Sequence, residues 1–151
     1  MNLPPELLQL IEEGVWPETY EQAIKQNLSS LLGPSEVRQF AEEEERIYLY
    51  SPPFPTVWSE MEMNPKSFWF DPRSATHELD PLRSVILGDF GPGSDAAIVL
   101  DFRGSLSNPC VMRLRWGAEG NHWVRCFETF SDFAAILRRS HSERIKARIL
   151  T

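Results

Sequence analysis

The sequence predicts an α+β fold with a mainly antiparallel sheet packed by helices. Three observations predict it: short amphipathic segments fill the first forty residues, apolar runs follow between residues 85 and 128, and a helical pattern returns after residue 129. Helices, then consecutive strands, then a helix is an α+β order, whereas a parallel sheet needs strands and helices in alternation. A length of 151 residues predicts a single domain over residues 1–151.

The front half of the chain predicts short helices. The first covers residues 4–13, with prolines at its start and Gly14 after its end. The second covers residues 18–27. The third begins near Pro34 and continues into four consecutive acids, Glu42–Glu45.

A short strand is expected at residues 47–50, because their aromatic and branched side chains favour a strand. The three prolines that follow within residues 51–55 indicate a loop or sheet edge. Residues 56–82 do not show a clear period. Phe68–Phe70 within them are expected in the core.

The second half of the chain predicts four strands and a turn. The turn, Gly88–Asp95, is rich in residues that accept unusual backbone angles. The second strand is almost continuously apolar, as expected at the centre of a sheet covered on both faces. The third alternates and forms a hairpin with the fourth. The expected strands are residues 85–87, 96–102, 110–116 and 122–128.

The hairpin allows a prediction of register. A turn centred on Glu119 places Leu114 opposite Val124 and Arg113 opposite Arg125. Like charges directly across a sheet cost stability, so something should compensate them. The candidates are an acid within the domain (Asp101 or Glu128), a cation–π contact with Trp123, or an acid on a partner. In the same register His122 faces Trp116.

The pattern after residue 129 predicts the clearest helix. Phe130, Phe133, Ala134 and Leu137 recur at i, i+3, i+4 and i+7 and form one apolar stripe. This helix is expected to end near Arg139. A separate short basic helix is expected over residues 142–150.

Charge and composition narrow the function classes. The net charge is −7, and residues 1–80 carry 15 acids against 5 bases, while residues 81–151 carry 7 acids against 10 bases. An acidic chain does not favour nucleic acid as its main partner. No apolar run is long enough for a membrane span, and no signal peptide is recognisable. Two cysteines, Cys110 and Cys126, do not make a disulfide framework, so the cytoplasm is the expected location.

Catalytic and metal-binding patterns are weak. The three histidines are scattered, and neither a metal-ligand spacing nor a nucleophile elbow occurs. The turn Gly88–Asp95 lacks the Lys-Ser/Thr ending of a phosphate loop and precedes a strand instead of a helix. We therefore expect a protein that is not an enzyme and has no metal and no cofactor.

The second half also resembles a known family. The run 85–95, the strand that follows it, the segments 111–116 and 121–124, and the Phe130/Phe133 helix are similar to the SUKH superfamily. The resemblance is strongest over residues 83–138. That superfamily contains fungal cell-wall-assembly regulators and bacterial immunity proteins that neutralise toxins. The resemblance implies an α+β fold and binding of a protein partner, and it carries over no catalytic residue.

The expected function is therefore that of a protein-binding module, with an immunity-type toxin inhibitor or a regulatory scaffold as alternatives. An acidic surface can attract a basic toxin, and tryptophan is favoured at binding hot spots. The candidate partner-binding residues are Glu42, Glu43, Glu44, Glu45, Asp89, Asp95 and Trp58. Two structural alternatives stay open: the glutamates form a solvated helix face, and the two aspartates satisfy backbone donors of the turn. The sequence does not reveal the oligomeric state.

Overall fold

The computed structural model describes residues 2–65, 78–118 and 120–150. The predicted α+β class is confirmed: a five-stranded antiparallel sheet with strand order β1-β2-β3-β4-β5 is packed by helices. The strands are β1 (Tyr48–Leu49), β2 (Ser84–Asp89), β3 (Ala97–Asp101), β4 (Cys110–Arg115) and β5 (His122–Phe127). The predicted Phe68–Phe70 anchor lies outside the described residues.

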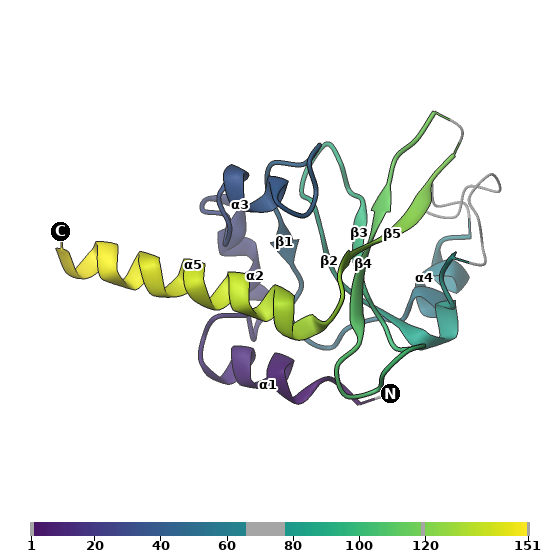
Figure 1. The fold of residues 1–151 in the computed structure, drawn as a ribbon, viewed down its shortest axis with the longest axis horizontal. Helices are drawn as coiled ribbons and strands as arrows, with labels where there is room; N and C mark the ends of the chain where they lie inside the picture. Colours follow the sequence, from purple (N-terminus) through teal and green to yellow (C-terminus); the bar gives the residue numbers. More distant parts are fainter. Residues whose placement is uncertain (1, 66–77, 119, 151) are drawn as a thin grey trace.

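Most helices lie on one side of the sheet. Figure 1 shows α1, α2, α3 and α5 together on this side and α4 on the other. The helices are α1 (Pro5–Glu12), α2 (Tyr20–Ile24), α3 (Pro34–Arg38), α4 (Val57–Met63) and α5 (Phe130–Leu150), with short 3₁₀ turns η1 (Lys25–Asn27) and η4 (Pro81–Arg83). Because both faces are covered, all five residues of β3 are buried, as its continuous apolar run predicts.

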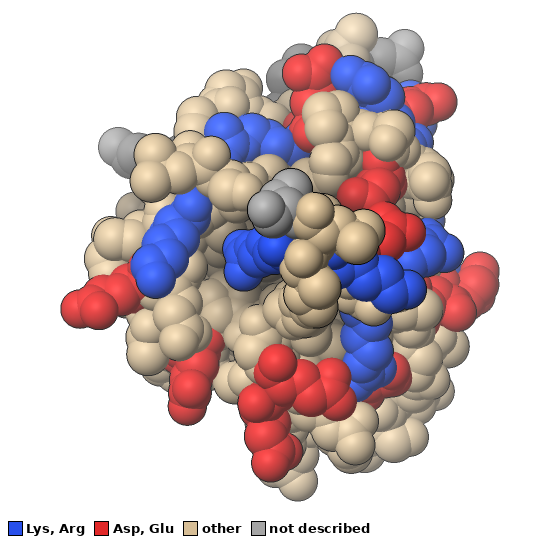
Figure 2. Space-filling model, turned by 90° about the vertical axis from the view of Figure 1, so that its left-hand side faces the viewer, with Lys and Arg blue, Asp and Glu red and all other residues tan. Residues whose placement is uncertain are grey.

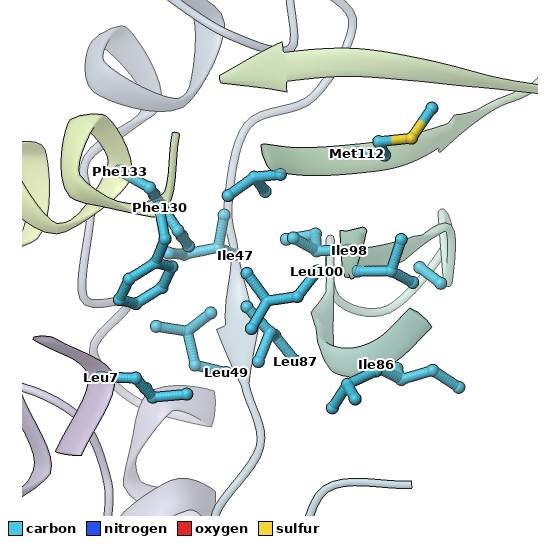
Figure 3. Packing of buried hydrophobic residues seen from close by; sticks show 14 of the residues in the cluster. Leu7, Ile47, Leu49, Ile86, Leu87, Ile98, Leu100, Met112, Phe130 and Phe133 are labelled. Atoms are coloured by element: carbon cyan, nitrogen blue, oxygen red, sulfur yellow. The ribbon is translucent and has the colours of Figure 1, made fainter. Parts of the chain in front are cut away.

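The core lies between the sheet and the α5 side. Figure 3 shows Leu87 of β2 and Leu100 of β3 pointing toward Leu7, Phe130 and Phe133, all five of which are buried. The phenylalanines of α5 join an aromatic cluster in which Phe130 and Phe133 meet edge to face, with ring centroids 6.2 Å apart. The helical stripe predicted from the spacing of these residues therefore packs as expected.

The C-terminal helix is one element and not two. The prediction of a separate basic helix over residues 142–150 is wrong, because α5 continues without a break to Leu150. No glycine or proline interrupts residues 130–150. The Ser140 hydroxyl also donates to the Leu31 carbonyl at 3.1 Å and fixes the middle of the helix to the body.

The register of the β4–β5 hairpin differs from the predicted one. Leu114 pairs with Trp123 and Arg113 with Val124, so Arg113 does not face Arg125. The predicted register is found at only one pair, Val111 with Phe127. A bulge between Val111 and Met112 shifts the remaining pairs by one residue. The like-charge conflict expected from the sequence is therefore removed by the bulge.

The free edge of β1 is closed by a side chain. Gln26 of η1 is buried, and its amide oxygen accepts from the Leu49 backbone N–H at 2.8 Å while its amide nitrogen donates to the Leu49 carbonyl at 2.8 Å. One side-chain amide thus makes both hydrogen bonds that a neighbouring strand would make. This contact also ties the helical front half to the sheet.

The residue Gly88 is required by a close approach of backbones. It lies within β2 opposite Leu49, and not in the turn where the sequence places it. A Cβ atom built at Gly88 would overlap the Tyr48 carbonyl oxygen. Only glycine lets β1 approach β2 at this position.

Replacement of this glycine tests the close approach. We expect Gly88→Ala to lower the free energy of unfolding by about 2 kcal/mol, because the methyl group pushes β1 away from β2. Urea unfolding followed by tryptophan fluorescence measures the change. Gly104→Ala is the matched control, since nothing lies within 4 Å of its added Cβ atom. Equal stability of the two variants would contradict the packing described for β1.

Candidate functional site

The four consecutive glutamates, residues 42–45, lie in a loop after α3, which we call the acidic loop. The expectation that they extend the third helix is wrong, because α3 ends at Arg38 and residues 42 and 43 form a turn. Each carboxylate therefore points in its own direction, and each finds a different partner. Two of these contacts hold the loop against β4, one joins it to the turn before β3, and the fourth joins it to α3.

The central contact of the acidic loop is an ion pair with the middle of the sheet. Arg113 of β4 is buried, with 6% of its side chain exposed, and both its terminal nitrogens donate to the two carboxylate oxygens of Glu43. The guanidinium also lies over the Phe90 ring, 6.0 Å from its centroid. The acid that compensates Arg113 is thus inside the domain, but it is Glu43 and not Asp101 or Glu128; of those two proposed acids, Glu128 pairs with Arg125.

The second contact joins the acidic loop to the glycine turn, which in the structure covers residues 90–95. Glu44 is only 8% exposed, and its Oε1 accepts a hydrogen bond from the Ser94 hydroxyl at 2.7 Å across 50 residues of chain. Burial raises the pKa of Glu44, and the neighbouring Glu43 carboxylate adds to the effect, although Ser94 and Arg113 oppose it. Burial alone would also raise the pKa of Glu43, but the hydrogen bond and charge of Arg113 outweigh it and hold that pKa below its usual range.

The two outer glutamates make exposed ion pairs. Arg115 donates to Glu42 at 3.3 Å, and Arg38 donates to Glu45 at 2.8 Å. Glu42 keeps 75% of its side chain exposed, and Glu45 keeps 72%. Exposed pairs of this kind contribute roughly 0–1 kcal/mol, so they exchange partners readily.

Asp89 and Asp95 hold the glycine turn in shape. Asp89 accepts from the Gly91 backbone N–H at 2.8 Å and from the Tyr50 hydroxyl at 2.7 Å. Burial raises the pKa of Asp89, with a smaller effect from Asp95, although the two hydrogen bonds oppose the shift. Asp95 itself has a positive φ of 55°, and its backbone N–H donates to the Gly91 carbonyl at 3.1 Å. Asp89 therefore satisfies a backbone donor of the turn, as the structural alternative drawn from the sequence expects.

The acidic loop and the glycine turn together line a shallow depression of about 450 Å³, which we call the loop–turn surface. Phe90 and Trp116 are both among its lining residues, but the Phe90 side chain is buried, and of the two only Trp116 is exposed. The sequence did not single out Trp116 for binding, because its strand position gave no sign that the chain would leave the sheet there. The residues that line it are Glu43, Glu44, Glu45, Arg46, Phe90, Pro92, Gly93, Ser94 and Trp116.

Trp58 belongs to a different element from the rest of the candidate set. It lies on α4 and is exposed. It does not line the loop–turn surface. Of the seven residues predicted from the sequence, the structure brings the four glutamates together with the glycine turn and leaves Trp58 apart from them.

A second hollow of about 540 Å³ lies where β3, β4 and β5 meet the start of α5. Its charged groups are paired with each other: Arg103 binds Asp101 with contacts of 2.8–3.1 Å, and Arg125 binds Glu128 at 3.1 Å. The Cys110 thiol contacts Asp101 at 3.7 Å, and burial together with that carboxylate raises its pKa. A thiol with a raised pKa is a poor nucleophile, so this hollow offers weak support for catalysis.

The arrangement at the loop–turn surface suits a cation. Carboxylates attract a guanidinium or ammonium group, and aromatic side chains can pack on its hydrocarbon stem. Among the described residues, no group of three or more histidine, cysteine or acidic side chains is arranged to hold a metal ion. Within the same part of the chain, no helix has the length and apolar character needed to cross a membrane.

Comparison with known proteins adds no assignment: no family model, curated protein or solved structure matches this chain.

The two ion pairs of the acidic loop allow a matched test of burial. We expect Glu43→Ala to lower the free energy of unfolding by about 3 kcal/mol, because it leaves the Arg113 charge buried without its partner. Glu42→Ala should cost less than about 1 kcal/mol, because Arg115 is exposed. Chemical unfolding of both variants at neutral pH measures the difference. Equal losses would contradict the central role of the buried pair.

Titration of Glu44 gives a second test. Because its folded-state pKa is raised, Glu44 contributes stability that is fully present below its unfolded pKa and is lost as the pH rises through the folded value. Glutamine resembles the protonated acid and keeps the acceptor for Ser94. Glu44→Gln should therefore raise the unfolding free energy at pH 7 by about 0.5–1 kcal/mol and leave it unchanged at pH 3.5. Thermal unfolding at both pH values measures it. A loss of stability at pH 7 would refute the assignment.

Proposed function

We propose that this chain is a non-enzymatic protein-binding module of the SUKH superfamily, and that it receives basic side chains of a partner protein at the loop–turn surface. The five-stranded antiparallel sheet and the C-terminal helix that packs on it are consistent with the proposed class. The observation that carries the proposal is the loop–turn surface itself, an open depression that combines carboxylates with the exposed Trp116.

The charge balance of this surface decides how a partner binds. Four arginines, Arg38, Arg46, Arg113 and Arg115, lie on or beside the four glutamates of the acidic loop. The loop therefore contributes little long-range attraction, and recognition depends on short-range exchange of ion pairs.

The two kinds of ion pair then have different roles. Glu43 binds the buried Arg113, Glu44 is itself buried against Ser94, and these two contacts keep the loop in place. Glu42 and Glu45 are exposed and bind Arg115 and Arg38 only weakly. Basic side chains of a partner can therefore replace these two arginines. Trp116 beside them supplies the aromatic side chain that interface hot spots favour.

The partner proposed here is a cognate toxin, which an immunity-type protein in the cytoplasm would neutralise by covering its active site. Steric blockage needs no chemistry from this chain and fits a shallow surface better than a deep cleft. The alternative is a regulator or scaffold of the cell-wall-assembly type, with a protein partner but no toxin. The neighbouring gene separates the two: a large toxin gene supports the first, and its absence favours the second.

If a toxin gene lies next to this gene, co-expression of the two tests the proposal. We expect the wild-type chain to restore growth, and calorimetry to give about tenfold weaker binding for Trp116→Ala and for the double variant Glu42→Lys/Glu45→Lys. The matched control is Glu12→Lys/Glu62→Lys, which reverses two exposed glutamates elsewhere. Full protection and unchanged affinity in the double variant would contradict binding at the loop–turn surface.

A further inference from the structure

The C-terminal part of α5 extends beyond the body of the protein. Ser140 is the last buried residue of the helix, and residues 141–150 are all partly or fully exposed. Ten helical residues are about 15 Å long. Figure 1 shows this part of α5 running outward past the other helices. We call residues 141–150 the helix tip.

The helix tip is both apolar and basic. Ile145 and Ile149 are one helical turn apart and exposed, Ile149 to 77%, and Leu150 follows them. The tip also carries three basic residues and one acid. Two turns of helix with little packing are marginal by themselves, so exposed isoleucines on such a segment indicate a surface that is covered in use.

A second apolar stripe runs from α2 to the residue that follows η1. Tyr20, Ile24 and Leu28 follow each other at intervals of four residues, and all three are exposed, Leu28 to 94%. We call these three residues the α2 stripe. The surrounding segment, residues 12–28, carries four exposed acids and one base. Its charge is therefore opposite to that of the helix tip.

The two surfaces lie at the same end of the molecule. The Arg144 guanidinium donates to the Ser30 carbonyl, and the Ser140 hydroxyl donates to the Leu31 carbonyl. These bonds fix the base of the helix tip beside the segment that follows Leu28. Figure 2 looks onto this end and shows basic side chains around its middle, with acidic ones below them, at both sides and at the top.

We propose that the helix tip docks on the α2 stripe of a second copy of this chain, in a two-fold symmetric dimer. Within one chain both surfaces stay exposed, because the tip is fixed at its base and runs outward. The base of each tip lies beside Leu31, which follows the α2 stripe by three residues in the sequence.

Charge favours this occupant over two others. Two basic tips repel each other, so each tip gains more from the acidic 12–28 segment of the other copy than from the other tip. An anionic membrane would attract the tip, but the whole chain carries −7 and the tip offers only three large apolar residues. In a two-fold dimer the contact between tip and stripe occurs twice. The proposal concerns self-association and does not depend on the proposed function.

Sedimentation velocity of the full chain over a wide concentration range tests the dimer. We expect reversible dimerisation, weakened at least about tenfold by Ile149→Asp and by Leu28→Asp. Leu82→Asp is the matched control, since Leu82 is an exposed leucine on η4. Circular dichroism checks that the variants fold. A wild-type chain that stays monomeric at the highest concentration would overturn the proposal. So would a dimer that survives both aspartate variants.

A charge exchange tests the reciprocal geometry. Glu21→Lys and Lys146→Glu each place like charges at both copies of the contact and should weaken the homodimer. In a one-to-one mixture, each tip meets a stripe of opposite charge at both contacts. We expect the mixed dimer to be about tenfold tighter than either variant alone. A mixture no tighter than its components, or a monomer that binds phosphatidylserine vesicles through the tip, would refute docking on a second copy.

Discussion

The buried ion pair between Arg113 and Glu43 is the constraint on which the loop–turn surface depends. A guanidinium in the middle of a central strand cannot be left without an acid, because an unpaired buried charge costs several kcal/mol. The bulge in β4 sets which residue of β5 faces this arginine, and the acidic loop brings the carboxylate from 70 residues earlier in the chain. The position of the loop then fixes Glu44, and Glu44 fixes Ser94 of the glycine turn.

These contacts divide the four consecutive glutamates into two that stabilise the loop and two that can bind a partner. Position in the sequence does not distinguish the four residues, but their contacts do: Glu43 binds the buried Arg113, and Glu44 is itself buried. Glu43 and Glu44 stabilise the loop, whereas Glu42 and Glu45 face solvent in weak pairs. A surface built in this way is preorganised, because its inner acids need no rearrangement when a partner exchanges the outer pairs.

Much of the sheet could be predicted from the sequence, because its signals are local. The β3 run, the alternation of β4 and the Phe130/Phe133 stripe each follow from the period of a single element. The errors arose where distant residues decide the outcome. The β4 bulge shifted the hairpin by one residue, and the continuity of α5 depends in part on Leu31. For the candidate site, the sequence identified the glutamates and the glycine turn as candidates. It did not predict that the two segments lie side by side, because this depends on the contact between Glu43 and Arg113.

The Gln26 amide has a consequence for how this sheet can grow. Strand-by-strand aggregation needs a row of free backbone donors and acceptors, and an edge strand normally provides one. At β1 that row is two residues long, and the Gln26 side chain already occupies the N–H and the C=O of Leu49. An incoming strand would have to displace a buried amide before it gained its first hydrogen bond. Intermolecular β-pairing is therefore blocked at this margin of the molecule, and any added strand must pair at the opposite one, along β5.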